Sequence, residues 1–285
     1  MRWLSYYKND SIHPGILTRD GKGVIDLNAE WNVDSPSWGQ ILRDRKFDEI
    51  MIRHCEEGWK NKPIPLGDIS LGPPVPDPSK VIAVGLNYRD HAEEQGKTPP
   101  EKPLLFAKAP SCLIGDGAPI VIPADESKPD AEAELAFVVA KTARDVSAND
   151  AYEYIAGITI MNDVSGREAQ YGDRQWFRGK SYDTFGPAGP WVVTLDEIKN
   201  PQNLELRCLV DGEPRQNGNT SDMIFGICDL MHYISRQMTL CPGDIVSTGT
   251  PAGVGVFRDP PLFINSGDLI EIELESVGKL TNRVE

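Results

Sequence analysis

Three acidic side chains in the middle of the chain have the spacing of a metal site. Glu132 and Glu134 stand two residues apart, just before the apolar run 135–139. In a strand, successive side chains alternate between faces, so both carboxylates would point to the same side. A second apolar run, 155–161, is followed closely by Asp163. If these two segments are neighbouring strands, the third carboxylate joins the first two.

Three carboxylates that face one space repel each other and are costly to remove from water. A divalent cation removes this cost, and oxygen-only ligation suits magnesium, manganese or calcium better than zinc. The E-x-E spacing is weak by itself, because the glutamates of segment 271–275 alternate with apolar residues as on a strand with one solvated face. The run that follows Glu134 is apolar without alternation, which favours a strand that is covered on both faces.

A histidine and a glutamate form the second candidate group. His91 and Glu94 are three residues apart in a short polar segment that follows the apolar run 80–85 and ends at Gly96 and Pro99. In a helix they share a face, where the carboxylate orients the imidazole and favours its protonated form. This is the usual arrangement of a general base and its orienting partner. The position of the segment between breakers is typical of a lid.

The chain is expected to fold as two units. Segments 1–7, 15–17 and 23–27 are predicted strands, and a helix is predicted to start at Ser37 and to use apolar positions up to residue 51. Four prolines lie within 73–78, where they exclude a helix interior or a central strand. The boundary is therefore placed between a small N-terminal α/β domain, 1–72, and a catalytic domain, 73–285.

Short strands outnumber helices in the second unit, so the predicted class is α+β, mostly β. Segments 204–210 and 213–215 form a predicted hairpin around Asp211 and Gly212. A helix is predicted over 223–238, with Ser221 as its cap, because apolar residues recur there at steps of three and four. A second capping pattern places a short helix after Ser147, and a third pairs Ser165 with Glu168.

Composition excludes several classes of function. The formal net charge is −14, which argues against nucleic acid and anionic membrane surfaces as partners. Small acidic substrates are compatible with it, because one metal ion and a few basic residues can dominate a pocket. The five cysteines are scattered, as in proteins of a reducing compartment. The sequence shows neither a signal core nor an apolar run of ~20 residues, so a cytoplasmic protein is expected.

Six sequence blocks occur in an order that resembles the fumarylacetoacetate hydrolase family. The resemblance covers residues 80 to about 275 and is closest to bacterial hydrolases of acylpyruvates and diketo acids. The blocks are G-L-N-Y-R-D-H-A-E-E, P-L-L-F-A-K-A-P-S, E-A-E-L, N-D-V-S-G-R-E-A-Q, K-S-Y-D-T-F-G-P-A-G-P and S-T-G-T-P-A-G-V-G. The last block lacks the Gly-Lys-Ser/Thr ending of a phosphate loop, so nucleotide binding is rejected.

The resemblance implies a catalytic domain of rolled, mixed sheets that assembles as a homodimer. It implies a metal ion, Mg²⁺ or also Mn²⁺ or Ca²⁺, and a lid whose histidine and glutamate act together on water. It gives no position for the additional acidic ligand of larger eukaryotic members, so three protein ligands are assigned. The residues that it assigns are Glu132, Glu134 and Asp163 for the metal, His91, Glu94 and Lys180 for catalysis, and Arg167, Gln170, Lys180 and Thr250 for substrate.

The resemblance implies hydrolysis of a carbon–carbon bond in a 1,3-diketo acid, with an acylpyruvate, maleylpyruvate, fumarylpyruvate or diketo-deoxy sugar acid as substrate. The cation stabilises the enolate, His91 with Glu94 activates water, and Lys180 holds the oxyanion or the substrate carboxylate. Isomerisation or decarboxylation of a 2-oxo acid is the alternative, because the same metal site serves both. Neither reaction requires an activated water, so activity that survives removal of His91 favours the alternative. A metal-dependent binding protein without catalysis is a third hypothesis.

Overall fold

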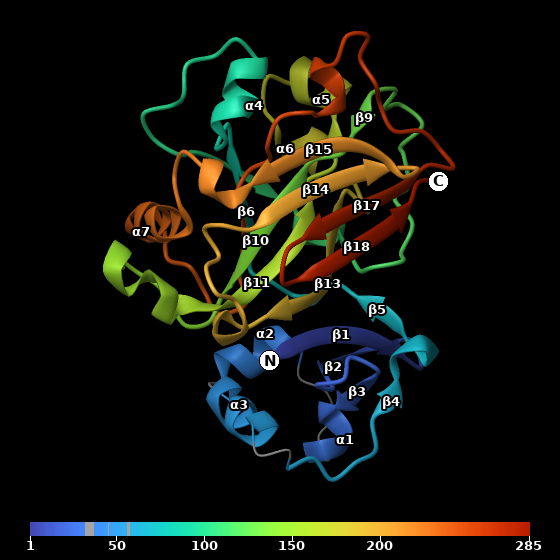
Figure 1. Ribbon diagram of the computed structural model, residues 1–285, viewed down its shortest axis with the longest axis vertical. Helices are drawn as coiled ribbons and strands as arrows, with labels where there is room; N and C mark the ends of the chain where they lie inside the picture. Colours follow the sequence, from blue (N-terminus) through green and yellow to red (C-terminus); the bar gives the residue numbers. More distant parts are fainter. Residues whose placement is uncertain (32–36, 45, 56–57) are drawn as a thin grey trace.

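The computed structural model describes residues 1–31, 37–44, 46–55 and 58–285. Most of its regular structure is strand, in a twelve-stranded sheet, a four-stranded sheet and a two-stranded pair, and its helices are short (Figure 1). The large sheet mixes parallel and antiparallel pairing and does not close on itself. These features confirm the predicted α+β, mostly β class.

The N-terminal part forms the lower unit in Figure 1. The hydroxyl of Ser37 accepts a hydrogen bond from the Gln40 amide at 3.1 Å, so the predicted cap is present. The single predicted helix is instead two helices, because the first ends at the C-cap Asp44. The elements are β1 (Arg2–Lys8), β2 (Ser11–Leu17), β3 (Gly23–Asp26), α1 (Leu27–Trp31), α2 (Trp38–Arg43), α3 (Phe47–Cys55), β4 (Ile64–Pro65), η1 (Leu66–Asp68) and β5 (Ser70–Gly72).

This unit shares its sheet with the rest of the chain. β1 pairs antiparallel with β13 (Gly186–Val193), where Trp3 lies opposite Val192. The strand order β4-β3-β2-β1-β13-β11-β10-β16-β6-β7 therefore runs across the predicted boundary. Trp3 and Ile41 also pack in one apolar cluster with Val138 of the large unit. The separate domain 1–72, the homodimer and the cytoplasmic location stay predictions.

Strand β10 (Ala133–Val139) lies inside this sheet, and all of its residues are buried. It pairs antiparallel with β11 and with β16. Leu135 and Phe137 belong to the largest apolar core, whereas Ala136 and Val138 belong to the cluster shared with the N-terminal unit. Both faces are covered, as predicted from the unbroken apolar run. The other strands of this part are β6 (Val81–Gly85), β7 (Leu104–Lys108), β8 (Leu113–Ile114), β11 (Ile155–Asn162) and β16 (Ile245–Ser247).

The four-stranded sheet packs on the opposite side of that core. The predicted hairpin is present, with Asp211 and Gly212 at positive φ in its turn. Glu271 and Glu273 lie on the outer face and pair with Lys279, which confirms that this alternating segment is a solvated strand. The strands, in the order β15-β14-β17-β18, are β14 (Glu205–Val210), β15 (Glu213–Asn219), β17 (Leu269–Leu274) and β18 (Gly278–Arg283).

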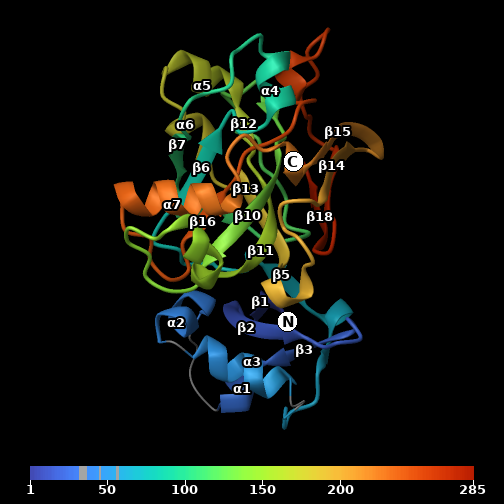
Figure 2. The same cartoon turned by 60° about the vertical axis from the view of Figure 1, so that its left-hand side comes forward.

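The helices of the large unit lie around its sheets. α4 and α5 lie at the end of the molecule far from the N-terminal unit (Figure 1), and α7 runs beside the large sheet (Figure 2). No helix of the described residues is long and apolar enough to cross a membrane. The remaining elements are α4 (Arg89–Glu94), η2 (Pro110–Cys112), β9 (Pro129–Asp130), η3 (Ala148–Tyr154), β12 (Ser165–Gly166), α5 (Arg167–Gly172), α6 (Phe177–Lys180), η4 (Leu195–Glu197), η5 (Thr220–Asp222), α7 (Ile227–Gln237) and η6 (Gly255–Phe257).

Two helix starts differ from the prediction. Ser165 does not cap α5, because it lies in β12, which pairs with β9, and its hydroxyl donates to the Asp163 carbonyl. α7 begins at Ile227 rather than near Met223, because the Asn87 side chain holds the backbone of the preceding Phe225 in an extended segment. The helix after Ser147 is present with its predicted cap, but it is a 3₁₀-helix.

Candidate active site and metal centre

The strand pair β10–β11 brings the three predicted carboxylates together. Glu132 and Glu134 occupy alternate positions, so they share one face, and Ala133 is paired with Asn162 on β11. The Asp163 amide donates to the Glu132 carbonyl at 2.9 Å, which places the aspartate directly beside the glutamates. One carboxylate oxygen from each residue lies within 4.8 Å of the others, and all three side chains are buried.

The chain's own cations contact two of these carboxylates. Lys180 donates to Glu132 and to Asp163, at 2.6 Å each, and Lys108 donates to the other oxygen of Asp163 at 2.6 Å. Arg167 donates to Glu132 at 2.7 Å. Lys180 and Arg167 are almost fully buried, so neither is a solvated surface charge. The repulsion among the carboxylates is therefore partly relieved within the protein itself.

The carboxylates differ in their tendency to ionise. Burial raises the pKa of Glu134 to about 8, and the charges of Asp163 and Glu132 act in the same direction. Burial also opposes ionisation of Glu132, but Lys180 and Arg167 outweigh it and hold the pKa of that carboxyl well below its usual range. Burial alone would lower the pKa of Lys180, yet the two carboxylates raise it. At neutral pH these effects favour the protonated form of Glu134 and the ionised form of Glu132.

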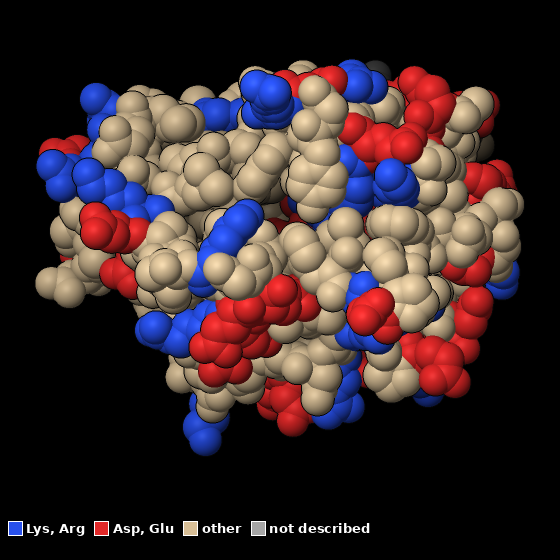
Figure 3. Space-filling model, turned by 90° about the horizontal axis from the view of Figure 1, so that it is seen from above, with Lys and Arg blue, Asp and Glu red and all other residues tan. Residues whose placement is uncertain are grey.

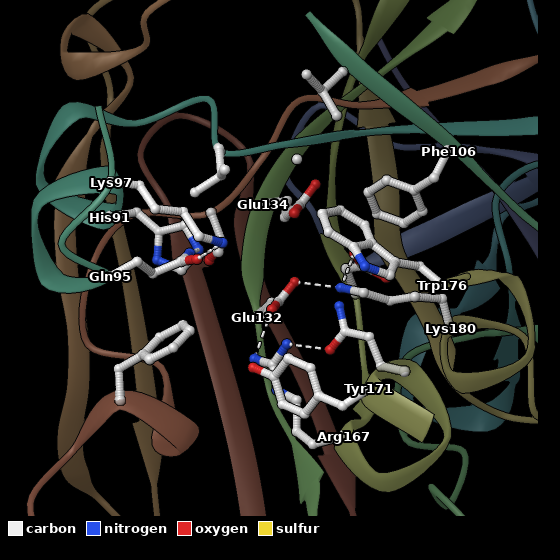
Figure 4. A pocket seen from close by; sticks show the side chains of 17 residues that line it. His91, Gln95, Lys97, Phe106, Glu132, Glu134, Arg167, Tyr171, Trp176 and Lys180 are labelled. Carbon is white, nitrogen blue, oxygen red and sulfur yellow. Dashed lines mark hydrogen bonds and ion pairs between the residues drawn. The ribbon is translucent and has the colours of Figure 1, made fainter. Parts of the chain in front are cut away.

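Asp130 positions Arg167 and the loop beyond it. Its carboxylate accepts from Arg167 at 2.7 and 3.1 Å and from the backbone amides of Gly255 and Val256 at 2.8 and 3.0 Å. Arg167 also donates to Gln170 at 2.9 Å, one turn further along α5. The guanidinium is thus held by Asp130, Gln170 and Glu132, and it lies at the wall of the cavity (Figure 4).

Helix α4, the predicted lid, packs on the loop that follows β16. The Glu94 carboxylate accepts from the Gly253 amide at 3.0 Å and pairs with His91 Nδ1 at 2.5 Å. In the tautomer with its proton on Nδ1, His91 donates to Glu94 and keeps the lone pair on Nε2. That nitrogen lies 2.8 Å from Gln95 Nε2, which donates to it. Asp90 fixes the same loop through the Ala252 amide at 3.2 Å.

A cavity of about 180 Å³ joins the lid to the carboxylates. His91 and Gln95 approach it from one side, Lys180 and Trp176 from the other, and Glu132 lies between them (Figure 4). The end of the molecule that carries α4 and α5 is hollowed near its middle (Figure 3). The residues that line the cavity are Val84, Gly85, Leu86, His91, Gln95, Lys97, Phe106, Glu132, Glu134, Asp163, Arg167, Gln170, Tyr171, Trp176, Lys180, Thr250 and Phe257.

Eight of the nine predicted site residues line this cavity, and the remaining one, Glu94, lies behind His91. Thr250 is buried and already engaged, because its hydroxyl donates to the Ala133 carbonyl at 2.9 Å and accepts from Gln216 at 2.6 Å. It therefore contributes to the wall more than it offers a free hydroxyl. The roles assigned to these residues stay predictions.

Sequence reasoning missed several residues of the site. Lys108 and Asp130 contact the predicted residues directly, and Trp176 and Phe106 form an aromatic wall with ring centroids 5.1 Å apart. Lys108 and Asp130 are single charges at the ends of apolar or polar segments, with no spacing that marks them. Their only signal is adjacency, since each lies in or beside a block that carries the family resemblance.

The donor set fits a hard divalent cation. Three carboxylates offer oxygen ligands at close range, and nitrogen or sulfur ligands are absent from this group of the described residues. Such ligands suit magnesium, manganese or calcium. The Ser247 hydroxyl and the Gly249 amide both donate to one oxygen of Glu134, at 2.5 and 2.9 Å, and so orient that carboxyl group. Gly249 has a φ of +99°, and a Cβ there would lie 2.8 Å from that of Asn87.

The chain is similar in sequence and in structure to several known enzymes. The chain is 39% identical over 274 residues to a mitochondrial oxaloacetate tautomerase of Bos taurus. The matched region covers 95% of this chain and 87% of that protein. The crystal structure of a 5-carboxymethyl-2-hydroxymuconate delta-isomerase from Mycobacterium smegmatis is 38% identical, with a TM-score of 0.78 and coverage of 100% and 98%. Maleylpyruvate hydrolase from a Sphingobium species, in complex with manganese(II) and pyruvate, is 31% identical, with a TM-score of 0.81 and the same coverage.

The family model described as fumarylacetoacetate (FAA) hydrolase C-terminal matches residues 80–285. This range contains every strand from β6 to β18 and every predicted site residue. The related proteins include hydrolases, isomerases and tautomerases, so membership of the family does not by itself determine which of these reactions takes place. The chain belongs to the fumarylacetoacetate hydrolase family.

Proposed function

We propose that the protein is a divalent-metal-dependent enzyme that converts 2-oxo acids through their enol form. The observation that carries the proposal is the buried group Glu132, Glu134 and Asp163 in one cavity with Lys180 and His91. A divalent cation bound there supplies positive charge that stabilises the enolate of a 2-oxo acid. The two buried cations of the cavity, Lys180 and Arg167, are already paired with carboxylates, so a bound divalent ion would supply charge that they do not.

The reaction that we propose is keto–enol isomerisation of a small 2-oxo dicarboxylic acid of the oxaloacetate type. This choice is supported by the 39% identity to an oxaloacetate tautomerase over 95% of the chain. It is also supported by a cavity of about 180 Å³, which suits a substrate of few carbon atoms. Isomerisation moves one proton between oxygen and carbon. His91, whose Nε2 can accept a proton, and Lys180, whose ammonium can donate one, approach the cavity from opposite sides (Figure 4).

Hydrolysis of a carbon–carbon bond is the second candidate, and the paired His91 and Glu94 favour it. With Nδ1 bound to Glu94, His91 Nε2 carries the lone pair that would accept a proton from water in place of the hydrogen bond from Gln95. Lys180 lies across the cavity, where its ammonium can hold developing negative charge on an oxygen. The structural similarity to a maleylpyruvate hydrolase supports this candidate.

One assay separates the candidates. The metal-loaded protein is mixed with the enol form of oxaloacetate, and the decay of enol absorbance is followed with Mg²⁺, with Mn²⁺ and after chelation. In parallel, acetylpyruvate and maleylpyruvate are tested for release of pyruvate. We expect metal-dependent loss of the enol above the uncatalysed rate. Faster release of pyruvate would establish the hydrolase instead, and an absence of both activities, or full activity after chelation, would refute the proposed function.

A further inference from the structure

Lys97 lies at the rim of the cavity and differs from the other cations that line it. Arg167 and Lys180 are buried and bonded to carboxylates, as described above. Lys97 is exposed, and its ammonium donates to the side-chain carbonyl of Gln95 at 2.8 Å, which is a neutral partner. Within the described ranges of the chain it forms no ion pair. Its charge is therefore available to a ligand.

Gln95 fixes the place of this ammonium. The amide of Gln95 accepts from Lys97 through its oxygen and donates to His91 Nε2 at 2.8 Å through its nitrogen. Gln95 thus links Lys97 to His91. The side chains of Lys97, Gln95 and His91 all approach the cavity from the same side (Figure 4). A lysine ammonium has three donors, so the bond to Gln95 leaves two for another acceptor.

The charges around the cavity favour a second substrate carboxylate as the acceptor for the Lys97 ammonium. The carboxylate next to the oxo group of a substrate would lie against the metal ion. A second carboxylate on the same substrate would enter a protein of net charge −14, and it would be costly to desolvate without a cationic partner. Lys97 is the cavity-lining cation whose contacts leave it free for that partner.

We propose that Lys97 binds the distal carboxylate of a dicarboxylic 2-oxo acid and so selects dicarboxylates over monocarboxylates. This inference rests on the proposed function and assigns it a specificity residue. Gln95 acts as a positioning residue for Lys97. Because the ammonium is exposed, the interaction is screened by salt, and one charge-assisted hydrogen bond of this kind corresponds to about a tenfold change in affinity.

The kinetic test compares oxaloacetate with its 4-methyl ester, which has the same oxo-acid end and no distal charge. In the metal-loaded enzyme, Lys97→Met is expected to raise KM for oxaloacetate by about tenfold and to leave kcat within about twofold. The KM for the ester should not change. Lys97→Arg should retain most of the preference, and Lys97→Glu should reverse it.

The matched control is Lys102→Met, which removes an exposed positive charge five positions further along the chain and outside the cavity lining. If it raised KM for oxaloacetate as much as Lys97→Met does, the effect would be one of general charge, and the proposal would be overturned. Equal effects of Lys97→Met on the two substrates, or no effect on either, would also overturn it. Added salt should weaken the wild-type preference and leave that of Lys97→Met unchanged.

A binding measurement separates this inference from the proposed function. Calorimetry of the Mn²⁺-loaded protein gives the Kd of pyruvate and of 2-oxoglutarate, which share the oxo-acid end and differ in the distal carboxylate. We expect 2-oxoglutarate to bind more tightly to the wild type, and this preference to be lost in Lys97→Met. A preference that survives the substitution would overturn the role of Lys97, even if turnover is present. Loss of the preference would support it, even if neither oxo acid is converted.

Discussion

Glu134 differs from the other two carboxylates of the triad in its partners. Glu132 and Asp163 each accept from an ammonium group of the chain, whereas Glu134 accepts from the Ser247 hydroxyl and the Gly249 amide. These neutral donors orient the carboxylate without offsetting its charge. This contrast explains why burial raises the pKa of Glu134, while Lys180 and Arg167 lower that of Glu132.

Metal binding should therefore release a proton from Glu134. The pKa of about 8 in the metal-free protein means that this carboxyl is protonated below that pH and must ionise to act as a ligand. The apparent metal affinity is expected to rise with pH up to about 8 and then to level off. Calorimetry in buffers of different ionisation enthalpy should detect about one proton per ion near neutral pH. Binding without proton release under those conditions would contradict this assignment.

Glu132→Gln should remove both the metal and the activity. The substitution also leaves Lys180 and Arg167 short of one buried carboxylate, although each keeps an aspartate partner. Breaking a buried ion pair typically costs about 3–5 kcal/mol, and we expect the lower end because of the remaining partners. The measurements are metal titration and denaturant unfolding of the metal-free protein.

Glu271→Gln is the matched control, because Glu271 lies on the solvated face of β17 in the same alternating pattern. It should change the free energy of unfolding by less than about 0.5 kcal/mol and leave metal binding intact. Normal metal affinity in Glu132→Gln would show that this carboxylate is a structural partner of the cations rather than a ligand.

At the level of elements, the predicted lid is the six-residue helix α4, which is anchored by its acidic side chains. Asp90 and Glu94 accept from the amides of Ala252 and Gly253. Gly253 has a φ of +106°, and a Cβ there would lie 2.2 Å from the Arg215 carbonyl, so a glycine is needed at this point. The helix is thereby held beside the cavity through contacts that do not involve the triad.

His91→Gln and Glu94→Gln should accordingly leave metal affinity unchanged. If the enzyme cleaves a carbon–carbon bond, we expect each variant to lower that turnover by about 10²–10⁴-fold, the usual contribution of a general base. Enol isomerisation, which needs no activated water, should fall less. Metal titration and the two assays described above provide the measurements, and a loss of metal binding in either variant would show that the roles are wrongly assigned.

Strand positions could be predicted better than helix starts. The apolar runs that form β10 and β11 are buried on both faces, so an unbroken apolar sequence is what their surroundings require. Helix caps depend on local competition. Ser165 has the residue type and spacing of a helix cap, but it pairs with Asp130 in a strand instead. Contacts of Phe225 with Asn87 keep the segment before α7 extended, so that helix begins later than predicted. These are contacts between distant segments, which local spacing does not contain.

The acidic part of the site could be inferred from alternation within one strand and the end of the next. The roles of the cations came only from the family resemblance, because the spacing of Arg167 and Lys180 is equally compatible with solvated surface charges. Lys108, which no spacing marks, lies on β7 at the edge of the large sheet and reaches Asp163 across the fold. Residues that meet through tertiary packing have no common period to reveal them.

At the scale of the whole molecule, the N-terminal unit completes the large sheet. Its removal would leave the edge of β13 unpaired and would uncover apolar residues such as Val138 and Val192 that now pack in the shared core. Such an exposed strand edge is a template for aggregation. The two units are joined by their hydrogen bonding as well as by the chain (Figure 1).

We therefore expect residues 73–285 alone to aggregate or to lose cooperative unfolding. Size-exclusion chromatography and thermal unfolding followed by circular dichroism would measure this, with the full chain as control. A monodisperse, cooperatively folding fragment that still binds metal would show that the boundary at residue 72 separates independent domains in the strict sense.

The buried ammonium and guanidinium groups beside the triad have a practical consequence. Since Lys108, Lys180 and Arg167 already form ion pairs with the acidic oxygens, we expect the protein to keep its fold without a bound metal ion. The protein should stay folded after the metal ion is removed by a chelator, and it should then bind a different divalent ion when one is added. Which ion it carries in a cell would then follow from supply rather than from folding.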